Sequence, residues 1–555
     1  MDGSGDMSIE TGSDARETVR AYHALSKHRL DRYAPGPGRM DWANQPDPFR
    51  RYAGCARTEL PLSSRARSAD WADVRTGAVA PPAPLDRDGL AALLELSLGL
   101  AAWKRFGGNR WALRCNPSSG NLHPTECYLV APALAGLPAG VHHYEPHDHV
   151  LEQRATLPPE AADGLRASLG GAVLVGLSAV HWREAWKYGV RAFRYCQHDA
   201  GHAIAAIAYA AALLGWRVRL LDGVADAEAS AALGIDREVD CAGAERETFQ
   251  ALLAVAPPQC APDPDAVLAA LRGAAWRGRA NRLSASEVDW PDIGRVAVAT
   301  AKHATPTLRC AHPLLPPLAR CAPGQRAADL IRQRRSAQAF DGRSPLDAPA
   351  FFRILDALLP REAVPPWDTL PWEPQIHPLF FVHRVAGLEA GLYALPRSEA
   401  AAAGLREALA GRWQWDAVPG CPSQLPLRRL LRRDLRAAAR TLSCHQEIAS
   451  DSAFAVTILG DFGGRIADGP HWYRWLHWEA GVLGQVLYLE AEAAGVRGTG
   501  IGCYFDDAAH EALGLAGDRW QDLYHFTVGT ALDDPRLQSE PAYGHLGPQR
   551  RGVSG

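Results

Sequence analysis

The 555-residue chain lacks several features that define specialised classes of protein. No run approaches the ~20 apolar residues that span a bilayer, and residues 1–10 lack the basic end and apolar stretch of a secretory signal. No basic block recurs at a spacing that would track phosphates, and 59 Lys and Arg against 62 Asp and Glu give a net charge of −3. These absences argue against a membrane or nucleic-acid partner and predict a cytoplasmic protein.

The eleven cysteines also lack a pattern. They are odd in number and form no repeated C-x-x-C, which in a chain of this size predicts reduced thiols rather than a disulfide framework. With 47% apolar and 22% charged residues, the composition is that of an ordinary globular protein. The length exceeds what one hydrophobic core supports, so two or more domains are expected.

An internal repeat organises the chain. Residues 193–217 (FRYCQHDAGHAIAAIAYAAALLGWR) align without a gap to residues 473–497 (YRWLHWEAGVLGQVLYLEAEAAGVR), 280 positions later. Both segments are rich in Ala and Leu and almost free of charge after a shared glycine, Gly201 or Gly481. Each is therefore expected to form a buried helix, and Gly215 and the matching Gly495 are its natural stops.

Two further blocks are repeated in the same order. Residues 136–144 (GLPAGVHHY) match residues 387–393 (GLEAGLY), and the apolar runs 172–177 and 454–459 predict buried strands before the paired helices. We therefore expect a duplicated fold. The predicted division is an N-terminal extension wrapping the first copy (1–84), a first copy (85–260), a linker (261–324), a second copy (325–540) and a C-terminal tail (541–555).

Two clusters have the chemistry of a binding site. In RRSAQAF (334–340), after a short helical start at 327–331, the guanidinium forks and the Ser336 hydroxyl suit a phosphate, whereas a surface Arg pair is the plainer interpretation. NPSSGNLHP (116–124) precedes a strand expected at 125–130. Its Pro and Gly fix a turn whose amides and hydroxyls could face a ring system, although a simple turn has the same composition.

Three other patterns have competing interpretations. GTGIG (498–502) follows a helix, which argues against a dinucleotide loop and favours either a close approach of the backbone to a planar ligand or a plain turn. HDAGH (198–202) has the spacing of a zinc-binding helix, but the aligned second copy has Trp478 and Val482 at the ligand positions, so no metal site is expected. The histidine-rich stretch 142–149 has ligands suited to a metal, but it falls in an expected hairpin, so solvated side chains without an assigned role are the favoured interpretation.

Together these segments resemble the SagB/ThcOx branch of the nitroreductase superfamily over most of the chain. The motifs stand in family order: YHALSKHR (22–29), MDWANQPDPFRRY (40–52), RCNPSSGNLHPTECYLV (114–130), AWKYGVRAFRY (185–195), RRSAQAF (334–340) and GTGIGCYFDDAAHEALGL (498–515). The resemblance implies an α+β fold of two tandem nitroreductase-like domains, each an antiparallel sheet wrapped by helices. The two domains would form a pseudo-dimer within one chain, with FMN at their interface.

The resemblance also assigns site residues. Those expected to bind FMN are Arg335, Ser336 and Gln338 at the ribityl phosphate and pyrimidine edge, Gly500 and Gly502 on the N5 side, and Pro117, Ser118 and Ser119 on the opposite face. They come from opposite copies, so the fusion would assemble one complete site. The reciprocal site would need a Pro-Ser turn where the second copy has WEPQIHP (372–378), and it is expected to be degenerate. Gln338 departs from the Arg usual in the superfamily, and His123 from the Tyr usual in this branch.

The activity implied by the resemblance is a dehydrogenase. It would oxidise a small-molecule or modified-peptide substrate, such as an azoline ring that becomes an azole, with a peptide-modifying cyclodehydratase as partner. Lys187 and Tyr188 would supply the base, which requires burial or, for the Tyr, a cationic neighbour such as Arg191 or Arg194; a packing role is the plainer interpretation. Two alternatives remain: an NAD(P)H-dependent reductase of nitro compounds or quinones, and a flavin-free scaffold in a peptide-modifying complex.

Overall fold

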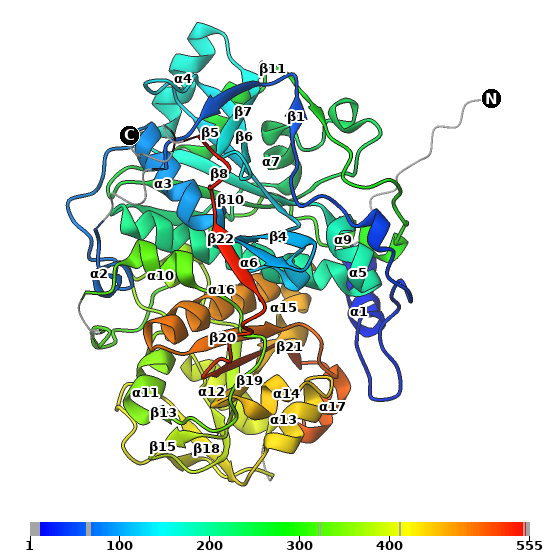
Figure 1. The fold of residues 1–555 in the computed structure, drawn as a ribbon, viewed down its shortest axis with the longest axis vertical. Coiled ribbons are helices and arrows are strands. Elements are labelled where there is room, and N and C mark those ends of the chain that lie inside the picture. Colours follow the sequence, from blue (N-terminus) through cyan, green and yellow to red (C-terminus); the bar gives the residue numbers. More distant parts are fainter. Residues whose placement is uncertain are drawn as a thin grey trace.

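The chain folds into two mainly antiparallel sheets on either side of a pair of central helices (Figure 1). This computed structural model describes residues 12–62, 68–319, 321, 324–409, 412–547 and 550. Short helices and loops cover the outer face of each sheet. The arrangement is the tandem α+β fold that the repeat and the family resemblance predicted.

The first sheet has eight strands in the order β11-β7-β6-β5-β8-β10-β9, with β2 also paired to β7. Their bounds are β2 (Ala56–Glu59), β5 (Thr125–Ala131), β6 (Gly140–Glu145), β7 (Val150–Thr156), β8 (Val173–Ala179), β9 (Arg217–Leu220), β10 (Thr248–Ala256) and β11 (Ala275–Trp276). Runs of β-branched and aliphatic residues bury both faces of the inner strands, as in β8, where every residue is buried.

The second sheet repeats this topology in the order β17-β18-β16-β14-β19-β21-β20. Its strands are β14 (Ile376–Val382), β16 (Gly391–Ala394), β17 (Asp416–Ala417), β18 (Arg428–Arg432), β19 (Phe454–Asp461), β20 (Arg497–Ile501) and β21 (Trp520–Gly529). The path β16-β14-β19-β21-β20 corresponds strand by strand to β6-β5-β8-β10-β9 in the first sheet. The two strands predicted from apolar runs are β8 and β19, so that prediction is confirmed.

The helices surround these sheets and differ greatly in burial. They are α1 (Gly12–Leu25), α2 (Trp71–Val74), α3 (Arg87–Ser97), α4 (Pro159–Leu169), α5 (His181–Tyr188), α6 (Ala192–Leu213), α7 (Asp226–Leu233), α8 (Pro264–Leu271), α9 (Pro291–Ala299), α10 (Ala327–Gln333), α11 (Ala348–Asp356), α12 (Glu399–Ala408), α13 (Arg436–Leu442), α14 (Glu447–Asp451), α15 (Phe462–Asp468), α16 (Trp472–Ala493) and α17 (Asp506–Leu513). Helix α6 is buried at every residue and α16 at all but its last two. They are the two buried helices that the repeat predicted.

Helices α6 and α16 cross where each has a glycine. A Cβ at Gly201 would overlap the carbonyl oxygen of Trp478, and one at Gly481 would overlap that of His198. The Gly481 Cβ would also lie only 3.0 Å from the Cα of Gly201. Only glycine at both positions lets the two backbones come this close.

The termini connect the two copies. Strand β22 (Gln538–Pro541), after the second sheet, pairs with β3 (Leu100–Phe106) of the first copy, which pairs with β4 (Asn109–Arg114). In Figure 1 this red strand lies over the first copy. Conversely, His23 of α1 hydrogen-bonds to Tyr473 and Gln521 of the second copy at 3.3 and 3.2 Å. The N-terminal extension, which was expected to wrap the first copy, therefore also contacts the second.

Three of the four histidines in the histidine-rich hairpin are buried, so the expectation of solvated side chains is wrong for them, whereas His147 is half-buried. The hairpin exists as β6 and β7, but His142, His143 and His149 have no exposed surface, because β6 lies between β5 and β7 and is covered on both faces. His143 hydrogen-bonds to Glu126 at 3.0 Å and to Glu152 at 3.1 Å. Burial opposes its charge, but these two carboxylates raise the pKa of His143 to about 9.

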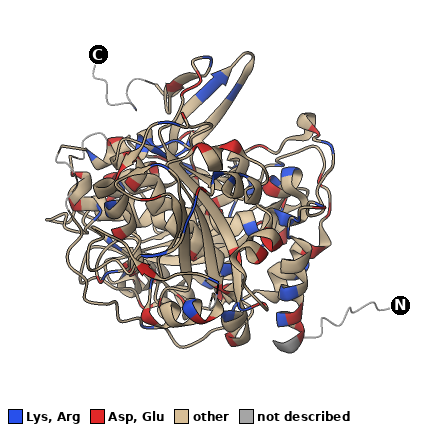
Figure 2. Ribbon diagram, turned by 90° about the horizontal axis from the view of Figure 1, so that it is seen from below, with Lys and Arg blue, Asp and Glu red and all other residues tan. Residues whose placement is uncertain are grey.

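Two further features concern the apolar character of the helices and the placement of charged residues. None of the helices within the described ranges combines the length and apolar character needed to cross a bilayer. Figure 2 shows basic and acidic residues interspersed along the ribbon, and neither sign dominates this view.

We predict that Gly201→Ala lowers the thermal unfolding midpoint, because the added methyl group overlaps the backbone of α16. The expected loss is about 1–3 kcal/mol, the usual cost of overpacking. Gly164→Ala in α4 is the matched control, since nothing lies within 4 Å of a Cβ there. Alanine should stabilise that helix by up to ~1 kcal/mol. Equal midpoints for the two variants, measured by circular dichroism, would show that the crossing tolerates a side chain.

Candidate functional site

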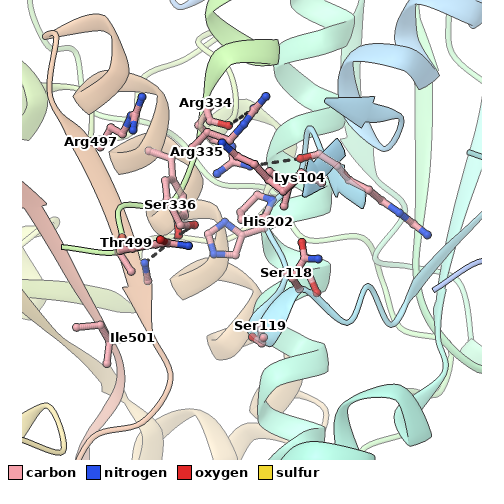
Figure 3. Close-up of a pocket in the computed structure, with 18 of the residues that line it drawn as sticks. Lys104, Ser118, Ser119, His202, Arg334, Arg335, Ser336, Arg497, Thr499 and Ile501 are labelled. Carbon is pink, nitrogen blue, oxygen red and sulfur yellow. Dashed lines mark hydrogen bonds between the residues drawn. The ribbon is translucent and has the colours of Figure 1, made fainter. Parts of the chain in front are cut away.

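A cavity of about 850 Å³ opens between the two copies. Its walls come from the turn at 116–121, from α6 and from β3 of the first copy, and from the segment 333–338 and β20 of the second. Figure 3 shows Arg334, Arg335 and Lys104 gathered at one end, with the Ser118–Ser119 turn on the side opposite β20. The eight residues expected to bind a cofactor all line this cavity: Pro117, Ser118, Ser119, Arg335, Ser336, Gln338, Gly500 and Gly502.

The cationic end of the cavity holds the guanidinium groups of Arg334 and Arg335, for which no ion pair is found among the residues that the structure describes, although the Glu492 carboxylate offsets part of their charge. Arg335 donates to the carbonyl oxygens of Arg332 and Arg334 at 2.6 Å and of Ala101 at 3.4 Å, and it forms no ion pair within the described ranges. Burial, and then the charge of Arg334, lower the pKa of Arg335 to about 10. Burial and the charge of Arg335 also lower the pKa of Lys104. A bound anion would relieve this mutual repulsion.

Tyr488 of α16 joins two walls of the cavity. Its hydroxyl is 2.8 Å from the Ser336 hydroxyl and accepts the Gly500 amide at 2.9 Å, while the Arg334 guanidinium lies over its ring at 4.9 Å. The side chain of Tyr524 occupies the space of a Cβ at Gly500, and that of Tyr195 the space at Gly502. These glycines are thus required by neighbouring tyrosines, and the Gly500 amide is engaged by Tyr488 rather than directed at a ligand.

The opposite turn is held by a buried carboxylate. Asp199 of α6 accepts hydrogen bonds from the Ser119 amide and hydroxyl, both at 3.0 Å, while the Ser118 hydroxyl accepts the His123 amide at 2.8 Å. Burial raises the pKa of Asp199 to about 7, against the lowering effect of hydrogen bonds from Ser118 and Ser119. A carboxyl group that titrates near neutrality and lines a cavity is suited to proton transfer.

Lys187 and Tyr188 lie at the end of α5, just before α6. Tyr188 lines the cavity, and the Lys187 ammonium lies 5.2 Å from the centre of its ring, outside the residues that form the wall. Burial, and then Glu184 and Tyr195, raise the pKa of Tyr188 well above its ordinary value. The phenol is therefore neutral at neutral pH. Arg191, the cationic neighbour considered from the sequence, forms an ion pair with Asp506 at 3.0 Å.

Lys104, Asp199, Tyr488 and Arg497 are among the cavity-lining residues that sequence reasoning missed. Asp199 carried a signal, because the repeat places Glu479 at the corresponding position. The repeat also pointed to Arg497, because Arg217 is the identical residue at the matching position of the first copy. Nothing in the sequence indicated Lys104, which reaches the cavity from a hairpin that the second copy does not repeat.

The reciprocal position is filled by protein. Arg75, which follows α2 as Arg334 follows α10, forms a buried ion pair with Glu490 at 2.7 Å. Glu479, the counterpart of Asp199, accepts hydrogen bonds from Trp372 at 3.1 Å and Arg397 at 2.5 Å. The cavity left beside Arg217 measures about 50 Å³. This geometry agrees with one complete site per chain.

Comparisons with known proteins support the fold. No protein-family model matches the chain, and no curated protein matches it. By structure it is similar to an Anabaena variabilis protein provisionally described as a nitroreductase, with TM-score 0.64 and 24% identity over 93% of this chain and 99% of that one. The chain therefore has a nitroreductase-like fold over nearly its whole length.

Other solved structures match parts of the chain with low TM-scores. One is a provisionally described nitroreductase of Exiguobacterium sibiricum in complex with FMN, with TM-score 0.23 and 13% identity over 38% of this chain and 91% of that one. Another is the Escherichia coli microcin synthetase McbBCD complex with truncated pro-MccB17, with TM-score 0.26 and 17% identity over 44% of this chain and 94% of that one.

We predict that Asp199→Asn raises the unfolding midpoint at pH 8. The raised pKa means that the folded state keeps this proton between about pH 4 and 7, so the parent loses stability as the pH rises through that window. The variant should be more stable by up to about 4 kcal/mol above pH 7 and equal below pH 4. The control Glu479→Gln should instead destabilise by about 3–5 kcal/mol, because Arg397 loses its buried partner. A lower midpoint for Asp199→Asn at pH 8 would mean that the ionised carboxylate stabilises the fold.

Proposed function

We propose that this chain is an FMN-dependent oxidoreductase that dehydrogenates a small molecule or a modified peptide. The main support is the cavity between the copies, where Arg334, Arg335 and Lys104 gather at one end and burial and mutual repulsion lower the pKa of Arg335 and Lys104. Its volume of about 850 Å³ falls in the range of small-molecule and cofactor sites. The motif resemblance to the SagB/ThcOx branch supports an azoline ring as substrate and a cyclodehydratase as partner.

The residues present fit an FMN. Arg335, Lys104 and the Ser336 hydroxyl would hold its phosphate, because guanidinium, ammonium and hydroxyl groups all donate to phosphate oxygens. Arg334 contributes a buried Nη1 with no hydrogen-bond partner within the described ranges. The turn with Pro117, Ser118 and Ser119 would cover one face of the ring system, and β20 with Gly500 and Gly502 the other, with Gln338 at its edge.

When bound, FMN would accept two electrons from the substrate. Converting an azoline to an azole also removes a proton from a ring carbon, so the chain must supply a base beside the cavity. We assign Lys187 and Tyr188 to this proton transfer, with the neutral Tyr188 phenol as the hydrogen-bonding group at the cavity wall and Lys187 behind its ring. Asp199, with its pKa near 7, is a second group able to take up that proton.

We predict one equivalent of non-covalent FMN per chain and weaker binding in Arg335→Ala. The lost charged hydrogen bonds correspond to about 1.5–3 kcal/mol, or a Kd increased about 10- to 150-fold. Flavin released on denaturation gives the stoichiometry, and titration of the apoprotein gives the Kd. Arg343→Ala is the control, since Arg343 is exposed and lies outside the cavity wall.

The outcomes of this experiment separate the alternatives. Two equivalents of FMN would mean that the reciprocal position also binds the cofactor. Absence of flavin in the purified protein, with no binding to the apoprotein, would favour the scaffold. Equal affinity of Arg335→Ala and the parent would place the phosphate elsewhere.

We predict that Lys187→Ala and Tyr188→Phe keep their FMN but slow its reduction by a thiazoline peptide at least ~100-fold, the usual reach of one acid-base group. Anaerobic single-turnover absorbance at the flavin band measures this rate. Tyr393→Phe is the control, because its hydroxyl donates to Glu389 in the second copy, outside the cavity wall. If both variants reduced their flavin at the parent rate, another group such as Asp199 would have to take up the proton. Turnover of nitro compounds with NAD(P)H, without reduction by the peptide, would identify a reductase instead.

A further inference from the structure

Two cysteines from distant parts of the second copy meet at the rim of the cavity. Cys503 follows β20 and lines the cavity, while Cys444 lies between α13 and α14. Two contacts hold these loops side by side: the Phe505 amide donates to the Leu442 carbonyl at 2.9 Å, and the Gln446 side chain donates to the Cys503 carbonyl at 3.1 Å. These contacts place Cys444 and Cys503 on adjacent loops, and each thiol shifts the pKa of the other.

The surroundings of Cys503 favour the thiolate. His28 Nδ1 accepts the Ala34 amide at 2.9 Å, which places the imidazole proton on Nε2, and His28 lowers the pKa of the Cys503 thiol. Arg191 donates to the carbonyl of Gly502, the preceding residue, at 3.0 Å, and is itself paired with Asp506. A positive charge and a hydrogen-bond donor beside a sulfur both stabilise its anionic form.

This environment distinguishes Cys503 from the other cysteines. Cys444, and then His28 and Arg191, lower the pKa of Cys503 against the raising effect of burial, and the same coupling raises the pKa of Cys444 well above its ordinary value. By contrast, burial raises the pKa of Cys115 and of Cys421 to about 11. Both Cys444 and Cys503 are half-buried, so small molecules can reach them.

The backbone at Cys444 adopts an uncommon conformation. Cys444 and His445 have φ angles of 54° and 60°, the left-handed region that non-glycine residues seldom adopt. The Gln446 side chain donates to the Ser443 carbonyl at 2.9 Å as well as to Cys503, and this closes the turn against the neighbouring loop. The turn therefore holds Cys444 beside Cys503 without a covalent bond.

We propose that Cys444 and Cys503 form a redox-active thiol pair that exchanges with low-molecular-weight disulfides. The Cys503 thiolate attacks the disulfide, forming a mixed disulfide and releasing one thiol. The Cys444 thiolate, after losing its proton, then attacks the Cys503 sulfur and releases the second thiol. Two protein thiols are oxidised to one intrachain disulfide while one external disulfide is reduced to two thiols. The bond would tie the 443–446 turn to the wall of the cavity.

The test is oxidation of the full chain with oxidised glutathione, followed by non-reducing peptide mapping with mass spectrometry. The parent should lose two titratable thiols and yield a linked Cys444–Cys503 peptide. Cys444→Ser should instead retain glutathione on Cys503, because the resolving thiol is gone. Cys421→Ser is the matched control, a half-buried cysteine whose thiol donates to the carbonyls of Pro422 and Leu425, and it should give the same linked peptide as the parent.

Competition for alkylation gives a second readout that does not depend on disulfide formation. At pH 7, iodoacetamide should modify Cys503 at least ~10-fold faster than Cys421, because a larger share of Cys503 is thiolate. Failure to detect the linked peptide in the parent, or linkage of Cys503 to a different cysteine, would overturn the proposal. So would equal alkylation rates for Cys503 and Cys421. These readouts concern thiols alone, so their failure would leave the FMN proposal untouched.

Discussion

The close contact between α6 and α16 at Gly201 and Gly481 governs the rest of this structure. On α6, Asp199 lies two residues before Gly201 and hydrogen-bonds to the Ser118–Ser119 turn. On α16, Tyr488 lies seven residues after Gly481 and hydrogen-bonds to Ser336 and to Gly500 of β20. The two walls of the cavity are thus attached to two helices whose separation is set by contact between backbones. A side chain at the crossing would move both walls apart, even though neither glycine lines the cavity.

The duplication left two positions that began alike and now differ in chemistry. In one, Asp199 has only amide and hydroxyl donors, so burial leaves its carboxyl group titrating near neutrality. In the other, Arg397 neutralises Glu479, and Glu490 neutralises Arg75. The same scaffold therefore supports a polar cavity on one side and a packed ion-pair core on the other.

How much could be predicted from the sequence depended on the range of the contacts involved. The paired helices and the strands β8 and β19 were predictable because periodicity and apolar runs are local signals. The Arg335 loop and the Ser118–Ser119 turn were predictable from motifs that resemble a known family. Lys104 and β22 were not, because they act through partners more than 200 residues away in the chain, and such contacts leave no local pattern. The buried histidines were missed for a related reason, since composition alone does not show that β6 is covered on both faces.

The pairing of β22 with β3 has a consequence for the order of assembly. Part of the cavity wall lies in and just before this strand, and its residues are Leu532, Asp533, Asp534, Pro535, Leu537 and Ser539. A chain emerging from the ribosome exposes the first copy long before these residues exist, and domains generally begin to fold as they are synthesised. The first sheet can therefore form early, but the cavity acquires its last wall only after the second copy has been made. Any capture of a ligand by the complete cavity must follow translation of both halves.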